Sequence, residues 1–340
     1  MRRAGRPGRG AAGAVPVVTR TLGVLLLVMA GSARAVAVSA APTAQEPPVT
    51  GTADPKRAEL HARLERDLAL LTDRLDGVAG YLIRDAATGE TFERHADAVF
   101  PVASVIKLPI YLELLRQAEE GTIDLARPIT VDPKGRVEGG GVLEKWSEPY
   151  PALSAAQLAV LMMNFSDNYA TNVLIDLVGM ERVGRRLKAW GIKETLLRRK
   201  MMDLEAARAG RENVSTPRDM AALLERLSGG QALNASDSEQ AIAVMKRNEK
   251  TAIKKGLPPD VASADKEGEL DGVRCDVGIV FVPAGRGPSA PTRPLVIVLM
   301  TTYLGDDPAG EAYISDVTRA AYAYFHNLAL ASRYGRRIEP

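Results

Sequence analysis

Cysteine is almost absent from this 340-residue chain, which limits both its covalent cross-links and its lipid attachments. The single cysteine, Cys275, has no partner for an internal disulfide, and no earlier cysteine could carry a lipoprotein anchor. Cys275 lies in an apolar run that ends at Val282. We therefore expect a small buried side chain at this position rather than a reactive thiol.

Histidine is scarce as well, and this argues against a zinc hydrolase. The three histidines, His61, His95 and His326, show neither a His-x-His nor a His-Glu-x-x-His spacing. No glycine-rich nucleotide-binding pattern follows a predicted strand, because the glycine run 139–141 lacks both the spacing and the lysine. That run predicts either a flexible loop at the mouth of a cleft or a plain surface connection. We therefore expect no metal and no cofactor.

Long hydrophobic runs are missing too. The apolar run 22–30 is shorter than the roughly 20 residues that a membrane-spanning helix needs. The first 35 residues carry six arginines and no acid, and they end in the small-x-small sequence Ala33-Arg34-Ala35. Residues 1–35 are therefore predicted to be a signal peptide, and the protein to be secreted or otherwise extracytoplasmic. A second candidate cleavage site is Val38-Ser39-Ala40, and an uncleaved membrane anchor is the alternative.

The chain also has no large excess of charge of one sign. Its formal net charge of +2 becomes −4 once the six arginines of residues 1–35 are removed. This balance argues against nucleic acid or an anionic membrane as a partner. We expect a small-molecule substrate and a monomer.

What remains is organised as one large domain. Residues 36–55 are rich in Ala, Pro, Thr and Val without a helical or strand period, which predicts a flexible linker. Residues 56–334 are long enough for one two-lobed domain and contain no internal repeat. Hydrophobic spacing predicts helices over 57–75 and 308–332, and strands over 78–85, 90–95, 261–266, 273–282 and 295–302.

The middle of the chain is predicted to be helical. Capping-box patterns begin at Ser154 and Ser236, and Thr216-Pro217 places a cap before a proline at the first helical position. These three signals mark helix starts. Together the segments predict an α/β architecture, in which five strands with flanking terminal helices pack against an all-α lobe, with a catalytic cleft between the two.

Three short motifs follow one another along the chain: Ser104-x-x-Lys107, Ser166-Asp167-Asn168 and Lys266-Glu267-Gly268. A hydroxyl is a poor nucleophile at neutral pH unless a base takes its proton, and residues three apart on a helix share a face. Taken alone, each motif has an ordinary structural explanation: the first is typical of a solvated helix face, the second of a turn or a helix cap, and the third of a turn. The first opens a helix after a strand pair, the second interrupts a helical stretch and the third ends a strand. In this order and setting they indicate a serine acyl-transfer site.

With these motifs the chain resembles the class A β-lactamases and penicillin-binding serine enzymes over residues 57–334. Residues 270–280 resemble the family's strand after the lysine-glycine motif, and residues 214–220 the start of the helix after its active-site loop. The resemblance implies a β-lactamase/DD-peptidase-like two-lobed fold, with a five-stranded antiparallel sheet, flanking helices and an all-α lobe. It also implies a serine hydrolase that opens β-lactam amides, an activity that confers antibiotic resistance.

The resemblance further implies a role for each motif residue. Ser104 would attack a carbonyl carbon to form an acyl-enzyme, with Lys107 as the base or as part of a proton relay through water. Ser166 would carry a proton toward the leaving nitrogen, and Asn168 would hold the substrate amide and the Lys107 side chain. Lys266 would supply positive charge near Ser166 and the substrate carboxylate.

Substrate binding is implied for a second group of residues. The backbone N–H groups of Ser104 and Glu269 would stabilise the oxyanion, with no part for the Glu269 side chain. Glu267 stands where the family usually has threonine or serine, and its carboxylate would repel an anionic substrate unless it points away or pairs with a cation such as Arg274. The substrate-binding set is thus Asn168, Glu267, Gly268, Glu269 and Arg274.

A second departure concerns deacylation. The family's Glu-x-x-Leu-Asn loop, whose glutamate activates the hydrolytic water, is replaced here by residues 200–208. Asp203 and Glu205 are the available substitutes, and either is equally consistent with a solvated or ion-paired residue beside the neighbouring arginines. If neither serves, the acyl-enzyme would be long-lived, as in penicillin-binding proteins.

Three hypotheses therefore remain open. The first is a secreted class A-type β-lactamase acting through a Ser104 acyl-enzyme. The second is a D-alanyl peptidase or esterase of the cell envelope with slow deacylation. The third is a catalytically silent module that binds peptidoglycan fragments, which the complete set of motif residues argues against.

Overall fold

The computed structural model describes residues 54–147, 149–285, 287, 289–332 and 334–337. The predicted signal peptide lies outside these residues, and so does the predicted linker up to residue 53. The first helix, α1 (Pro55–Asp73), begins slightly before the predicted residue 57, because Asp54 caps it and Pro55 occupies its first turn.

Five strands form one antiparallel sheet, as predicted, and the structure gives their order as β2-β1-β9-β8-β7. The two ends of the chain supply them: the hairpin β1 and β2 comes from the first third, and β7 to β9 from the last. β7 is an edge strand, so one side of its backbone has no strand partner. The bounds are β1 (Val78–Asp85), β2 (Thr91–Arg94), β7 (Ser263–Leu270), β8 (Val273–Pro283) and β9 (Thr292–Thr302).

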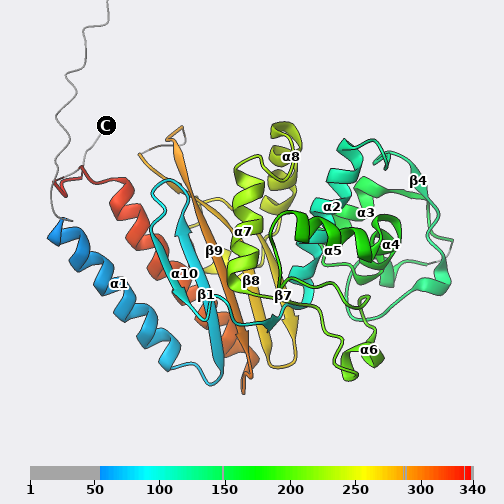
Figure 1. Ribbon diagram of the computed structural model, residues 1–340, viewed down its shortest axis with the longest axis horizontal. Helices are drawn as coiled ribbons and strands as arrows, with labels where there is room; N and C mark the ends of the chain where they lie inside the picture. Colours follow the sequence, from blue (N-terminus) through cyan, green and yellow to red (C-terminus); the bar gives the residue numbers. More distant parts are fainter. Residues whose placement is uncertain (1–53, 148, 286, 288, 333, 338–340) are drawn as a thin grey trace, which may run out of the picture. The chain divides into compact units, whose positions relative to one another are not determined.

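Helices cover both faces of this sheet (Figure 1). α1 and α10 (Asp307–Ala329) pack together on one face, and α7 (Pro217–Ser228) packs on the other. Alternation along the strands separates the two cores: Leu82 and Val298 belong to the cluster on the α7 side, whereas Ile83 and Ile297 belong to the cluster beneath α1 and α10. Strands β1 and β9 therefore contribute side chains to both cores.

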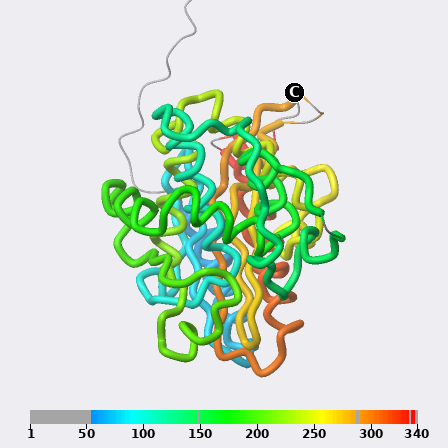
Figure 2. Tube along the Cα trace, turned by 90° about the vertical axis from the view of Figure 1, so that its right-hand side faces the viewer, coloured from blue at the N-terminus to red at the C-terminus, as the bar shows by residue number. Residues whose placement is uncertain are grey.

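The remaining helices, apart from α9 (Ala252–Gly256), form the all-α lobe beside the sheet, and Figure 2 shows this lobe in front of the strands. α9 instead packs against α10 and the strands β7 and β8. No helix in the described part of the chain is both long and apolar enough to cross a membrane. The helices of the lobe are α2 (Lys107–Glu119), α3 (Ala155–Asn164), α4 (Asn168–Val178), α5 (Met180–Ala189), α6 (Leu204–Arg208) and α8 (Ala235–Lys246). Short elements between them are β3 (Phe100–Pro101), η1 (Ala103–Ile106), β4 (Pro128–Ile129), η2 (Pro133–Gly135), η3 (Leu143–Lys145), β5 (Leu153–Ser154) and β6 (Val214–Ser215).

Two of the three predicted helix starts are confirmed. Ser154 forms a reciprocal capping box with Gln157, and Thr216 caps α7 with Pro217 in its first turn. The third is wrong: Asn234 rather than Ser236 caps α8, because the Asn234 side chain accepts a 3.0 Å hydrogen bond from the Asp237 backbone N–H. Asparagine caps helices at least as well as serine does.

The prediction for the third motif is also corrected. β7 continues to Leu270, so Lys266, Glu267 and Gly268 lie within the strand rather than at its end. The reason is pairing, since β7 remains in register with β8 from Ser263 opposite Val280 to Leu270 opposite Val273. The motif is therefore held by a continuous ladder of strand pairing.

Cys275 is buried in β8, as expected. Burial raises the pKa of its thiol to about 12. Because the thiolate is the reactive form, this cysteine is an inert core side chain.

Candidate active site

Ser104 lies where a short strand turns into a helix. β3 ends at Pro101, the single turn η1 carries Ser104, and α2 begins at Lys107. Ala103 adopts a positive φ of 47°, an unfavourable conformation for a residue with a Cβ atom. Phe100, with 2% of its surface exposed, anchors the segment in the core. The surrounding structure thus holds a strained turn that leaves Ser104 half-buried at the start of a helix.

Lys107 is completely buried at the start of the same helix. Its Nζ lies 2.6 Å from the Ser166 carbonyl oxygen, 3.0 Å from the Ser166 hydroxyl oxygen and 2.9 Å from Asn168 Oδ1. Burial, and next the nearby charge of Lys266, lower the pKa of Lys107 well below its ordinary value, although two carboxylates oppose this shift. The amine is therefore poised to act as a base.

Ser166 and Asp167 lie in the connection between α3 and α4, and Asn168 is the first residue of α4. Ser166 has a positive φ of 50°, and Asp167 is the N-cap of α4. Asp167 Oδ1 accepts a hydrogen bond from Ala170 N, and Oδ2 accepts hydrogen bonds from the backbone N–H groups of Val142 and Leu143 at 2.7 and 2.8 Å. One buried carboxylate therefore fixes both the second motif and the loop that precedes η3.

That loop contains the glycine run 139–141, and the structure places it at the pocket. Asn168 Nδ2 donates to Gly139 O at 3.0 Å, and both Gly139 and Gly140 line the cavity. Gly141 has φ +127°, and a Cβ atom there would approach Asp167 Oδ2 to 2.4 Å. The prediction of a loop at the mouth of a cleft is confirmed, and close packing accounts for glycine at position 141.

β7 forms the opposite wall. Lys266 is completely buried, and its Nζ donates to Glu267 Oε1 at 2.8 Å and to Glu267 O at 3.0 Å. A Cβ atom on Gly268 would come within 2.6 Å of Val102 O and 3.1 Å of Ser104 N. Only glycine lets this edge strand approach the backbone around Ser104 so closely.

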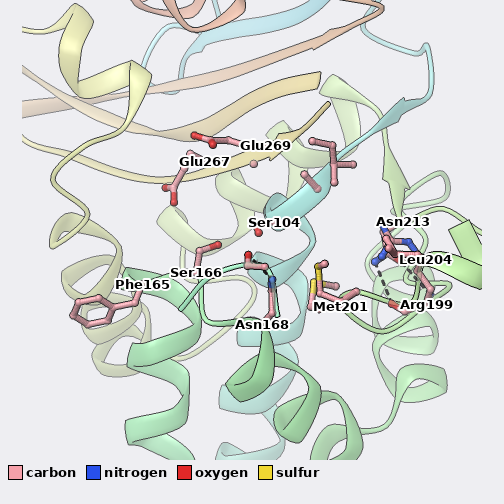
Figure 3. A pocket seen from close by; sticks show the side chains of 16 residues that line it. Ser104, Phe165, Ser166, Asn168, Arg199, Met201, Leu204, Asn213, Glu267 and Glu269 are labelled. Carbon is pink, nitrogen blue, oxygen red and sulfur yellow. Dashed lines mark hydrogen bonds between the residues drawn. The ribbon is translucent and has the colours of Figure 1, made fainter. Parts of the chain in front are cut away.

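These elements enclose a cavity of about 360 Å³. Figure 3 shows Ser104, Ser166 and Asn168 gathered below the strand that carries Glu267 and Glu269. The described residues that line the cavity are Ala103, Ser104, Gly139, Gly140, Phe165, Ser166, Asn168, Arg199, Met201, Met202, Leu204, Asn213, Glu267, Gly268, Glu269 and Leu270.

Five predicted site residues do not line this cavity: Lys107 and Lys266 are completely buried, and Asp203, Glu205 and Arg274 lie elsewhere. Asp203 is exposed, and its side chain caps α6 by accepting a 2.9 Å hydrogen bond from Ala206 N; Glu205 is exposed on the same short helix. Arg274, one cation that could have paired with Glu267, does not do so, and Lys266 pairs with Glu267 instead. Its guanidinium lies 3.0 Å from Asp307, because strand register places Arg274 opposite Glu269 rather than opposite Glu267.

The sequence analysis assigned residues 200–208 to the site but did not identify Arg199 and Asn213, which line another wall of the cavity. Asn213 Oδ1 accepts hydrogen bonds from the backbone N–H groups of Arg198 and Arg199 at 2.8 and 3.1 Å. Its carbonyl oxygen accepts a hydrogen bond from Val102 N at 3.1 Å, two residues before Ser104. Arg199 is paired with Glu212 at 2.7 Å. A single buried asparagine has no recognisable sequence pattern, and only the fold identifies it.

Comparisons with known proteins agree with this geometry. The model of the β-lactamase enzyme family matches residues 63–325. A β-lactamase from Streptomyces fradiae is 31% identical over 266 residues, which cover 76% of this chain and 85% of the relative.

Solved structures agree as well. A β-lactamase from Sphaerobacter thermophilus is 30% identical with a TM-score of 0.68, covering 76% of this chain and 95% of that one. The L158E mutant of PBP-A, solved as an acyl-enzyme complex with penicillin G, is 26% identical with a TM-score of 0.69, covering 78% of this chain and 96% of that one. The chain belongs to the β-lactamase enzyme family and is a serine hydrolase of the class A β-lactamase type.

Proposed function

We propose that the protein is a secreted hydrolase that opens β-lactam and related amide bonds through an acyl-enzyme on Ser104. The observation that carries the proposal is the buried Lys107, whose lowered pKa favours the neutral amine and whose helical spacing places it beside Ser104. Secretion is supported by the arginine-rich, apolar sequence of residues 1–35.

Acylation would proceed by attack of Ser104 Oγ on the carbonyl carbon while its proton moves to the Lys107 amine. Nζ has three oxygen neighbours, Ser166 O, Ser166 Oγ and Asn168 Oδ1, but a neutral amine has only two N–H donors, so its lone pair is left to take the Ser104 proton. The resulting ammonium donates to the Ser166 hydroxyl oxygen 3.0 Å away, and Ser166 can then pass its own hydroxyl proton on. This contact gives a path by which the proton reaches the leaving nitrogen as the carbon–nitrogen bond breaks.

The developing oxyanion would be held by the backbone N–H groups of Ser104 and Glu269. The closeness of the two backbones supports this assignment, because a Cβ atom on Gly268, the residue before Glu269, would lie only 3.1 Å from Ser104 N. Donors aimed at developing charge stabilise a transition state by about 3–4 kcal/mol each. The L158E mutant of PBP-A forms an acyl-enzyme complex with penicillin G, which supports the same type of intermediate here.

Intact-protein mass spectrometry tests this proposal. We expect benzylpenicillin and a chromogenic cephalosporin, supplied in excess, to add their mass to the wild-type protein on Ser104. A Ser104→Ala variant should form no adduct, because it has no nucleophile. A wild-type protein that neither carries an adduct nor hydrolyses either reagent would contradict the proposal and favour the silent binding module, and an equal adduct on Ser104→Ala would contradict the role of Ser104.

A second candidate function differs in the step after acylation. Asp203 and Glu205 do not line the cavity, and the acids that do, Glu267 and Glu269, lie on β7. This favours a D-alanyl peptidase or esterase of the cell envelope, in which the acyl group leaves slowly. Persistence of the Ser104 adduct for many minutes would support this candidate, and rapid turnover would support a β-lactamase.

The two loop acids give a direct test of deacylation. Because neither lines the cavity, Asp203→Asn and Glu205→Gln should change the decay rate of the adduct less than about threefold, whereas loss of a general base costs about 10²–10⁴-fold. The decay is followed by mass after removal of excess reagent. A hundredfold slower decay in either variant would identify that residue as the base.

A further inference from the structure

The positive charge of Lys266 on β7 is neutralised by the neighbouring carboxylate of Glu267. Lys266 is completely buried, and the ion pair to Glu267 Oε1 spans 2.8 Å. Lys266 also donates to the Glu267 carbonyl oxygen at 3.0 Å, so two of its three N–H donors point at one residue. Little of its positive charge is left to attract an anionic ligand.

Glu267 has an unused acceptor. Its Oε2 atom is buried and has no hydrogen-bond partner among the described residues. Burial would raise the pKa of Glu267, but the charge and hydrogen bonds of Lys266 outweigh this and lower it, so the side chain is a carboxylate at neutral pH. Figure 3 shows this side chain extending from β7 toward Ser166. A buried carboxylate oxygen without a donor is unfavourable, and an N–H group on a bound substrate would satisfy it.

The other charged groups that line the cavity do not restore a positive field. Arg199 is paired with Glu212 at 2.7 Å, and Glu269 is an exposed carboxylate that forms no ion pair among the described residues. The lowered pKa of Lys107, caused first by burial, reduces its positive charge as well. A substrate on Ser104 therefore faces a wall with a negative balance of charge.

We propose that Glu267 is a specificity residue, and that this site is acylated faster by substrates that present a protonated amine to the Lys266–Glu267 pair than by substrates that present a carboxylate there. This inference rests on the proposed acylation of Ser104 and names the substrate class of that site. The amine donates to Glu267 Oε2, while a carboxylate there meets an acceptor that cannot donate.

Three thioesters with one common acyl group test the inference. Their leaving thiols are mercaptoacetate, which is anionic, mercaptoacetamide, which is neutral, and 2-(dimethylamino)ethanethiol, which is protonated at neutral pH. All three give the same acyl-enzyme, and each rate of thiol release under single-turnover conditions is divided by the uncatalysed hydrolysis rate of that thioester, so the remaining differences report acylation by the enzyme. We expect the amine ester to acylate Ser104 at least about tenfold faster than the carboxylate ester, the equivalent of about 1.4 kcal/mol.

Variants identify the residue responsible. Glu267→Gln keeps the shape of the side chain and removes its charge, and Glu267→Thr removes the carboxylate altogether; both should lower the amine-to-carboxylate rate ratio at least about tenfold. Glu65→Gln is the matched control, because it also removes one negative charge. Glu65 is an exposed residue of α1, which packs on the face of the sheet opposite to α7. In Glu65→Gln the amine-to-carboxylate rate ratio should stay within about twofold of the wild-type ratio, since charges separated by more than a Debye length are screened.

The outcomes separate the two proposals. A wild-type preference for the carboxylate ester, or a ratio that survives Glu267→Gln in a folded variant, would overturn the role of Glu267 while leaving acylation of Ser104 in place. If no ester modifies Ser104, the proposed function fails and the inference fails with it. Should the Glu267 variants not fold, the wild-type ratio must still fall with rising ionic strength, and a ratio independent of salt would overturn the inference.

Discussion

Replacing Lys107 by methionine should slow the acylation of Ser104 by about 10³-fold, because general-base catalysis contributes about 10²–10⁴-fold. Methionine fills the buried space but cannot take the Ser104 proton. The rate constant for adduct formation, measured by rapid mixing and mass spectrometry, gives the size of the loss. Thermal unfolding confirms that the variant is folded.

Lys107→Arg distinguishes a base from a fixed positive charge. Arginine keeps the cation but does not release its proton at accessible pH, so it should be as slow as methionine. An arginine variant within about tenfold of the wild-type rate would show that charge, not proton transfer, is the contribution of Lys107.

The same base gives the pH dependence a definite direction. Burial, then the charge of Lys266, lower the pKa of Lys107, so the amine loses its proton at lower pH than an exposed lysine does. Below that pKa the protonated amine cannot accept the Ser104 proton, and above it the rate should level off. Acylation should therefore rise with pH through the lowered pKa, and this rise should disappear in Lys107→Met.

Replacing Asp167 by alanine should have the largest effect on stability, about 3–5 kcal/mol. Its carboxylate accepts three backbone hydrogen bonds, and its side chain is almost fully buried. Loss of an N-cap costs about 1 kcal/mol, and each buried N–H left without an acceptor costs about 1–3 kcal/mol. Urea unfolding measures the change, and acylation should slow too because the glycine loop loses its anchor.

Asn234→Ala is the control for this variant. Asn234 is an exposed N-cap that accepts one helix N–H, so its loss should cost about 1 kcal/mol and leave acylation unaffected. If Asp167→Ala costs no more than Asn234→Ala, then the contacts of Asp167 to the glycine loop contribute little to stability.

Much of the site could be predicted from local sequence. Ser104 and Lys107 are three residues apart at the start of a helix, so their proximity follows from helical geometry. Strand alternation predicted five strands, and the caps at Ser154 and Thr216 followed from side chains that bind backbone N–H groups within three residues. These are short-range effects, and that is why they are visible without a fold.

Pairing between distant charged residues could not be predicted in the same way. Arg274 was a reasonable partner for Glu267 by distance along the hairpin, but register places it opposite Glu269, and its side chain reaches Asp307. The wall made by Asn213 and Arg199 has no sequence pattern because a buried asparagine is recognised only by the backbone around it. Likewise, the capping of α8 was decided by which of two nearby polar residues the chain geometry placed at the helix start.

The sequence by itself determined the family and placed Ser104, the proposed nucleophile, three residues before Lys107, because these depend on residue identity and on short-range spacing. Only the tertiary structure decided that Lys266 is neutralised by Glu267, that Asp167 holds the glycine loop, and that Asp203 and Glu205 lie outside the cavity. The physical reason is that charge pairing and burial depend on register and packing between segments far apart in the chain, which residue order alone does not specify.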